Sequence, residues 1–212
     1  MLSLTFCAAC QIPLSVAEGL PPAGQTTCDL AGWGSDDNPA GINVHAGPSA
    51  DSPVLGTLPP VAPNPDGYDF IADFDIVASH NGWLQIRNAR DYPYGQPERE
   101  TYSGMGWIHG SKVTFRIQSG LGYQQPDPQS QKLLDLHGDW LTDVGRVNQV
   151  LACEGKWALL DYSLESSEDA DETAEASHQI PQELSGHTAW FRRVCAIQET
   201  TCDGIYDEMK AD

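Results

Sequence analysis

The sequence predicts an all-β protein made of two small β-domains, and three observations support this prediction. First, the 212-residue chain holds 20 Gly and 15 Pro, a composition that favours many turns over long helices. Second, apolar residues recur in short runs of period two, such as "INVH" at 42–45, and no helical period extends beyond two turns. Third, a tryptophan-bearing pattern of the first half recurs, less clearly, in the second half.

Five short strands are expected in the first domain, residues 25–118. The tight turn "HNG" at 80–82 lies between two alternating runs and indicates a β-hairpin. The stretch "RDYPYGQPERETYSG" at 90–104 is expected to be a polar, aromatic loop. Alternation points one set of apolar side chains into the interior of the sheet: Ile42, Val44, Ile76, Leu84, Ile86 and Ile108.

The second domain is expected at residues 130–208, after a linker at 119–129. Its segment "VLACEGKWALL" is similar to "IVASHNGWLQI" of the first half, and "HTAWFRRVCAIQ" is similar to "GMGWIHGSKVTF". Trp157 therefore matches Trp83, and Trp190 matches Trp107. "KLLDLHGDWLTDVGRV" is expected to be the opening hairpin of this domain, and residues 163–186 are expected to form a solvated loop because they carry seven acids and no base.

The pattern of the first half resembles that of bacterial SH3-like domains. The matching residues are Asn43, Val44, Gly47, Pro48, Ser49, Gly56, Leu58, Gly82, Trp83, Ile86, Gly106, Trp107 and Ile108. His45 stands where the family usually has Arg, and the resemblance reaches the second half only through Trp157, Trp190 and their flanks. It implies two tandem small SH3-like β-barrels with a targeting or interaction role at the cell envelope, commonly with peptidoglycan or a peptide.

A non-enzymatic binding module is the function that this reading predicts. Tryptophan offers a flat apolar face and a polar N–H, which suits a groove that stacks a ligand, although packing is the alternative role for such residues. The candidate ligand-binding residues are Trp83, Trp107, Tyr92, Tyr94, Tyr102, Asn43 and His45. No GxSxG motif is present and the six histidines are scattered, so we expect no catalytic residue, no cofactor and no metal site.

The charge of the chain limits its partners. It has 30 acidic residues against 11 basic ones, a net charge of −19, which excludes a nucleic-acid ligand because phosphate binding needs clustered Lys and Arg. A second hypothesis is that the chain is a protein-protein interaction or inhibitor-like protein that acts through its acidic loop. Calcium chelation by the acidic clusters is a further alternative, but their spacing is not that of a twelve-residue calcium loop.

The N-terminus and the cysteines predict a periplasmic or extracellular location. Residues 1–17 are uncharged and end in "SVA", which indicates a secretory leader without the usual positive start, and lipidation of Cys10 is the alternative. Removal of this leader leaves four disulfide candidates, whose complete pairing needs one bond between Cys28 and the second half: Cys28, Cys153, Cys195 and Cys202. Zinc binding is the rival interpretation of these cysteines, and no other apolar run reaches the ~18 residues of a membrane span.

Overall fold

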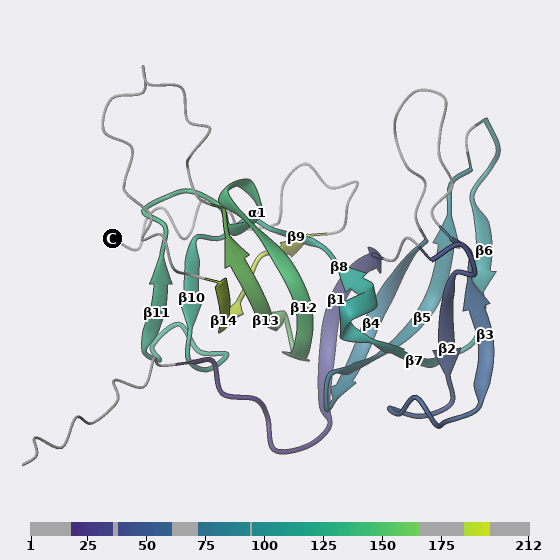
Figure 1. The fold of residues 1–212 in the computed structure, drawn as a ribbon, viewed down its shortest axis with the longest axis horizontal. Coiled ribbons are helices and arrows are strands. Elements are labelled where there is room, and N and C mark those ends of the chain that lie inside the picture. Colours follow the sequence, from purple (N-terminus) through teal and green to yellow (C-terminus); the bar gives the residue numbers. More distant parts are fainter. Residues whose placement is uncertain (1–17, 36–37, 61–71, 94, 166–184, 196–212) are drawn as a thin grey trace, which may run out of the picture.

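The computed structural model describes residues 18–35, 38–60, 72–93, 95–165 and 185–195, and these are mostly strands and turns (Figure 1). The described part holds one short α-helix, α1 (Leu141–Val144), and one 3-10 turn, η1 (Gly110–Lys112). The all-β prediction is therefore confirmed. The predicted leader, residues 166–184 of the predicted acidic loop, Tyr94 and Cys202 lie outside the described residues. Within those residues no helix has the length and apolar character needed to cross a membrane.

The first half of the chain forms an eight-stranded sheet in the order β3-β2-β7-β5-β4-β1-β8, with β6 paired to β5. Its strands are β1 (Thr26–Gly34), β2 (Ile42–His45), β3 (Val54–Leu58), β4 (Asp73–His80), β5 (Trp83–Asp91), β6 (Arg99–Tyr102), β7 (Gly106–His109) and β8 (Val113–Thr114). The predicted "HNG" hairpin is confirmed, because β4 and β5 pair across a turn in which Asn81 and Gly82 both have positive φ, 48° and 79°.

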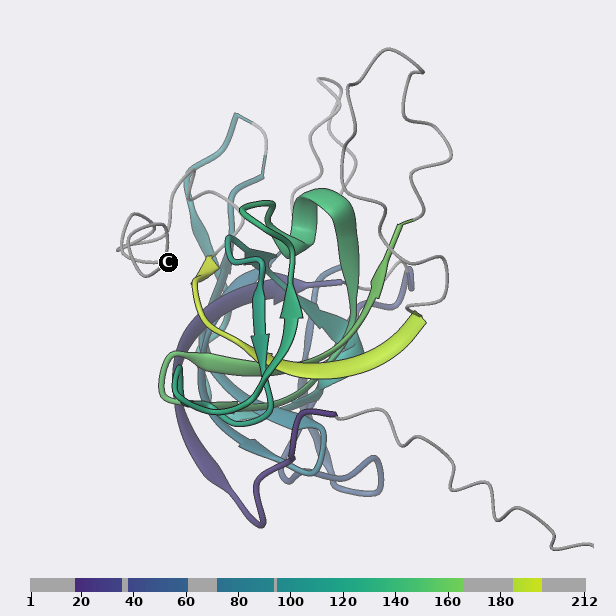
Figure 2. The same ribbon diagram turned by 90° about the vertical axis from the view of Figure 1, so that its left-hand side faces the viewer.

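The second half forms a five-stranded sheet in the order β11-β10-β14-β13-β12. Its strands are β10 (Leu121–Tyr123), β11 (Lys132–Asp135), β12 (Gly145–Glu154), β13 (Trp157–Leu164) and β14 (Ser185–Phe191). A separate two-stranded ladder joins β9 (Arg116–Ile117) to β15 (Val194–Cys195). In Figure 2 the second sheet lies in front of the first.

Five strands follow the same order in both sheets. The path β3-β2-β7-β5-β4 of the first sheet corresponds to β11-β10-β14-β13-β12 of the second. The register agrees as well, because Trp107 lies opposite the residue two positions after Trp83, and Trp190 lies opposite the residue two positions after Trp157. The repeat seen in the sequence therefore has a counterpart in strand order and in pairing register.

Two expectations about the start of the second half are wrong. Residues 119–129 are not a linker, since they contain β10, the counterpart of β2, which forms the opening hairpin with β11. Gly122 of β10 permits close packing, because a Cβ on it would lie 2.9 Å from the Cβ of Ala189. "KLLDLHGDWLTDVGRV" is not a hairpin, because it runs through β11 and α1 into the start of β12.

The strands β1 and β6 were not expected from the sequence. β1 carries polar and small residues, "TTCDLAGWG", yet it pairs with both β4 and β8. β6 lies in the stretch expected to be a loop, where its residues "RETY" pair with the end of β5. These two segments are strands because they pair with partners elsewhere in the sheet, and their own sequences lack the alternation that would have indicated a strand.

One buried cluster extends through both halves of the molecule. All six predicted interior residues of the first half belong to this buried core, with exposed fractions of 7% or less. Val150, Leu160 and Phe191 of the second half join the same cluster. Among the described residues no ladder closes either sheet into a barrel, so the prediction of two tandem SH3-like barrels is not confirmed. The two sheets share a core along their junction.

A disulfide and hydrogen bonds also join the two sheets at this junction. Cys28 of β1 forms a disulfide with Cys153 of β12, with a Cα–Cα distance of 5.6 Å, which confirms the expected bond between the halves. The buried Ser79 hydroxyl accepts from the backbone N–H of Cys153 at 2.9 Å and lies 3.1 Å from its carbonyl oxygen. Cys195 is also disulfide-bonded. These bonds are compatible with an oxidising compartment.

Candidate functional site

Three rings on neighbouring strands form what we call the aromatic row: His45, Trp83 and His109. The Trp83 ring lies 5.2 Å from that of His45 and 5.4 Å from that of His109, both edge-on, with interplanar angles of 74° and 77°. Each has core neighbours directly before or after it in its strand, so alternation places the row on the opposite, outer face of the first sheet.

Local sequence and strand order bring the row together. The positive-φ pair Asn81–Gly82 turns the chain so that Trp83 becomes the first residue of β5, where it pairs with His109 at the end of β7. His45 ends β2, where it pairs with Trp107 of β7. The strand β7 therefore holds β2 and β5 at the spacing that lets the three rings touch.

Hydrogen bonds fix opposite roles for the two imidazoles. Nδ1 of His45 lies 3.0 Å from the carbonyl oxygen of Ser52, which can only accept, so this nitrogen donates and Nε2 of the neutral ring is an acceptor. Nδ1 of His109 accepts from the N–H of Ser111 and lies 2.8 Å from its hydroxyl oxygen, so Nε2 of the neutral ring is a donor. One histidine of the row thus offers an acceptor and the other a donor.

The row borders a hollow of about 210 Å³, which we call the first hollow. Its lining residues are Asn38, Gly41, Ile42, Asn43, His45, Trp83, His109 and Lys112. No carboxylate is among them, although the chain carries a net charge of −19. A half-buried indole with hydrogen-bonding side chains and no carboxylate around it is suited to a polar ligand that stacks on a flat face.

The structure brings three of the predicted binding residues together and separates the others. Asn43, His45 and Trp83 line the first hollow. Trp107 is only 5% exposed and so presents little surface to a ligand. Tyr92 and Tyr102 are absent from the lining of the hollow, and the predicted Tyr94 lies outside the described residues.

The two displaced tyrosines have structural contacts. The hydroxyl of Tyr102 donates to the carbonyl oxygen of Met105 at 3.4 Å, and its ring lies so close to Gly56 that a Cβ there would approach it to 2.9 Å. The pKa of Tyr92 is raised, mainly by a hydrogen bond to the Glu98 carboxylate and to a smaller extent by burial. Tyr92 therefore contacts the segment before β6, and Tyr102 contacts β3.

We compared the chain with known proteins. No protein-family model, no curated protein and no solved structure matches it. The SH3-like resemblance therefore stays a prediction from the sequence.

Sequence reasoning did not select His109 and Lys112 for the site. The available signal was the alternation in "GWIHG", which places residue 109 on the same sheet face as residue 107. Their approach to Asn43 depends on the order β2-β7-β5, which local sequence does not encode. Among the described residues, no group of three or more His, Cys, Asp or Glu is arranged to hold a metal ion.

The second sheet contains a counterpart of the aromatic row. Tyr123 lies edge-on to Trp157 at 5.5 Å and 85°, in the position that His45 has relative to Trp83. The guanidinium of Arg192, two residues after Trp190, lies 5.9 Å from the centre of the Trp157 ring, in the position of His109. The repeat thus keeps the geometry of the row but replaces both imidazoles.

The N-terminal segment packs onto β14 beside this counterpart. The indole N–H of Trp190 donates to the carbonyl oxygen of Leu20 at 2.9 Å, and the N–H of Gly19 donates to the carbonyl oxygen of Thr188 at 2.7 Å. Trp190 is consequently 1% exposed. The two repeats therefore differ in their surroundings, since the N-terminal segment packs onto the second one.

Ionic contacts of the first sheet lie away from the hollow. Arg90 pairs with Asp73 at 3.1 Å, and Arg87 pairs with Asp75 at 3.4 Å. Burial raises the pKa of Asp73, and the charge and hydrogen bond of Arg90 oppose this rise. These charges lie on β4 and β5, while the first hollow keeps a lining without carboxylates.

Proposed function

We propose that this chain is a secreted, non-enzymatic binding module of the bacterial cell envelope that recognises peptidoglycan through the first hollow. The single observation that carries the proposal is the Trp83 ring, half-buried between two histidines with opposite hydrogen-bonding roles. The duplicated strand order and the residues shared with SH3-like domains support two tandem SH3-like modules. The disulfide and the uncharged N-terminal stretch support a periplasmic or extracellular location.

The expected recognition chemistry is stacking combined with hydrogen bonding. A sugar ring of the glycan presents an apolar face to Trp83, while its hydroxyl and acetamido groups need both donors and acceptors. His45 Nε2 supplies an acceptor and His109 Nε2 supplies a donor, and Asn43 adds a side-chain amide. We expect binding without a covalent step and with modest affinity, because the first hollow is smaller than the usual pocket for a drug-sized ligand.

The net negative charge of the chain favours the glycan of peptidoglycan over an anionic wall polymer. The surface of a chain with a net charge of −19 repels anionic wall polymers, whereas N-acetylated sugars carry no charge. A free peptide is the runner-up ligand, since peptide bonds also offer one donor and one acceptor each.

A pull-down on purified peptidoglycan tests the proposal. We expect Trp83→Ala to lower the apparent affinity for peptidoglycan roughly tenfold, which corresponds to the loss of about 1.4 kcal/mol of stacking free energy. The bound fraction at a given protein concentration falls accordingly. Trp157→Ala is the matched control, because it removes the equivalent half-buried ring of the second repeat and should keep binding. Equal binding by Trp83→Ala and the wild type, with thermal midpoints alike, would contradict the proposal.

A deletion separates this proposal from action through the acidic loop. A variant that lacks residues 166–184 removes most of the acids of that loop and leaves the first hollow intact. We expect it to bind peptidoglycan as the wild type does. If the deletion abolishes peptidoglycan binding and Trp83→Ala does not, the result would favour a role of the acidic loop in the interaction.

A further inference from the structure

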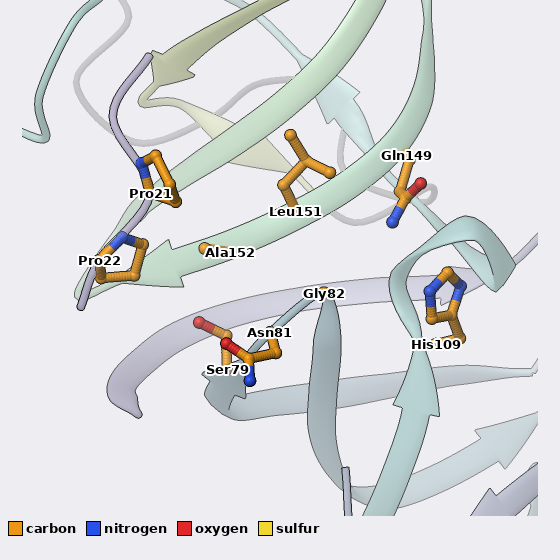
Figure 3. Close-up of a pocket in the computed structure, with 9 residues that line it drawn as sticks. All are labelled: Pro21, Pro22, Ser79, Asn81, Gly82, His109, Gln149, Leu151 and Ala152. Carbon is orange, nitrogen blue, oxygen red and sulfur yellow. The ribbon is translucent and has the colours of Figure 1, made fainter. Parts of the chain in front are cut away.

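A second hollow, of about 360 Å³, lies between the two repeats (Figure 3). One wall comes from β12 of the second sheet, with Gln149, Leu151 and Ala152. The opposite side comes from the β4–β5 turn of the first sheet, with Asn81 and Gly82. Figure 3 shows Pro21 and Pro22 at one end and His109 at the other.

The two hollows meet at His109, which lines both of them. Gly82 marks the same point, because a Cβ built on it would lie 3.5 Å from Nε2 of Gln149 and 3.8 Å from Nε2 of His109. The Gln149 side chain of the second repeat and the His109 ring of the aromatic row therefore both lie close to the backbone of Gly82. His109 thus lies between Trp83 of the first hollow and Gln149 of the second.

The relative position of the two hollows is fixed by the junction. The N–H of Gly110 donates to the carbonyl oxygen of Gly82 at 2.8 Å, and a Cβ on Gly110 would overlap the carbonyl oxygen of Val150. The Cys28–Cys153 disulfide joins β1 of the first sheet to β12, the strand that carries Val150. A ligand that spans both hollows therefore meets preformed surfaces and does not have to order them.

The proline end of the second hollow is held in place as well. The carbonyl oxygen of Leu20 accepts from the Trp190 indole N–H at 2.9 Å, and the N–H of Leu20 donates to the carbonyl oxygen of Gln124 at 2.8 Å. These bonds set the chain direction immediately before Pro21 and Pro22, which supply apolar surface. The far end of the path is thus formed jointly by the N-terminal segment and β12.

The lining of both hollows is poor in charge. The second hollow contains no Asp, Glu, Lys or Arg, and its polar groups are Ser79, Asn81, His109 and Gln149. Lys112 is the one formally charged residue of the two linings. Volumes of about 210 and 360 Å³ lie below and near the lower end of pockets for drug-sized ligands, so each hollow accepts a short unit and the two together accept a longer one.

We infer that both repeats bind one ligand together, and that this ligand is an extended glycan strand, bound through its uncharged N-acetylated sugar rings, that runs from Trp83 past His109 to Gln149. The inference rests on the proposed function and specifies its substrate as the glycan part of peptidoglycan, longer than one disaccharide. The carboxylates of stem peptides are disfavoured on this path by the net charge of the chain. Amide side chains of Asn81 and Gln149 suit the hydroxyl and acetamido groups of the second sugar unit.

Calorimetric titration with N-acetylglucosamine oligomers tests this inference. We expect the hexasaccharide to bind at least tenfold more tightly than the disaccharide, about 1.4 kcal/mol of additional binding free energy. The double variant Asn81→Ala/Gln149→Ala should bind the hexasaccharide no better than the disaccharide and should leave disaccharide binding unchanged. Gln129→Ala, an exposed glutamine outside both linings, is the matched control and should behave as the wild type.

The outcomes separate the two proposals. Equal affinity of the wild type for both oligomers, or an unchanged hexasaccharide affinity in the double variant, overturns the spanning ligand while Trp83-dependent peptidoglycan binding still stands. Binding of intact peptidoglycan without binding of either oligomer also overturns it and directs attention to the peptide part. Failure to bind peptidoglycan at all overturns the proposed function itself.

Discussion

Cys28 and Cys153 are separated by 125 residues in the sequence, and their disulfide ties the first sheet to the second beside the second hollow. We predict that Cys28→Ser/Cys153→Ser lowers the free energy of unfolding by about 2–5 kcal/mol, because the bond closes a long loop in the unfolded chain. Chemical denaturation without reductant measures the change.

The double variant avoids an unpaired thiol, and the wild type with added reductant serves as its control. Both should unfold at a lower denaturant concentration than the oxidised wild type, and the reduced wild type should be at least as unstable as the double variant because reductant also breaks the bond of Cys195. An unchanged unfolding midpoint in the double variant would show that the shared core alone holds the repeats together.

The contact between η1 and β12 makes Gly110 intolerant of a side chain. A Cβ at this position would overlap the carbonyl oxygen of Val150, so Gly110→Ala forces backbone to move and should cost about 1–3 kcal/mol of unfolding free energy. Gly24→Ala is the control, because no atom lies within 4 Å of its Cβ position. Comparable thermal midpoints for the two variants would refute the close packing of the junction.

The charge distribution predicts how salt affects binding. Neither hollow contains a carboxylate and the proposed ligand is uncharged, so affinity for the N-acetylglucosamine hexasaccharide should change by less than about twofold between about 0.05 M and about 0.5 M NaCl. A strong fall with added salt would mean that a cationic group such as Lys112 attracts the ligand. Titrations at the two salt concentrations make this measurement.

The sequence predicted those parts of the fold that depend on local pattern. Alternation identified the core positions from Ile42 to Ile108, and the positive-φ turn at Asn81–Gly82 followed from its residue types. The tryptophan repeat also matched equivalent registers, because Trp83 and Trp157 each begin the second strand of a hairpin.

What depends on distant partners could not be predicted. The segment that forms β10 was predicted to be a linker. The role of Gly122 in this strand is visible only in the structure, where it lies close to Ala189. The meeting of His45, Trp83 and His109 follows from the order β2-β7-β5, and the second hollow exists only because β12 packs beside the β4–β5 turn. Three of the predicted binding residues reach the first hollow, whereas Trp107 lies in a buried position that its residue type does not reveal.

Burial of Tyr162 predicts a loss of stability at high pH. Its side chain is 3% exposed and packs edge-on against Phe191 at 5.3 Å, and burial raises its pKa from 10.0 to about 12. The unfolded state therefore loses this proton at lower pH than the folded state. The stability that Tyr162 contributes is complete below pH 10 and is lost as the pH rises toward 12, to a total of roughly 2–3 kcal/mol.

Tyr162→Phe isolates this contribution, because phenylalanine keeps the ring and has no proton to lose. Unfolding free energies of the wild type and the variant, measured at several values from pH 9 to pH 12, should diverge in slope above pH 10. Other tyrosines and lysines titrate in both proteins, so the difference between the two curves reports Tyr162 alone. Parallel curves over this interval would mean that the Tyr162 hydroxyl reaches water in the folded state.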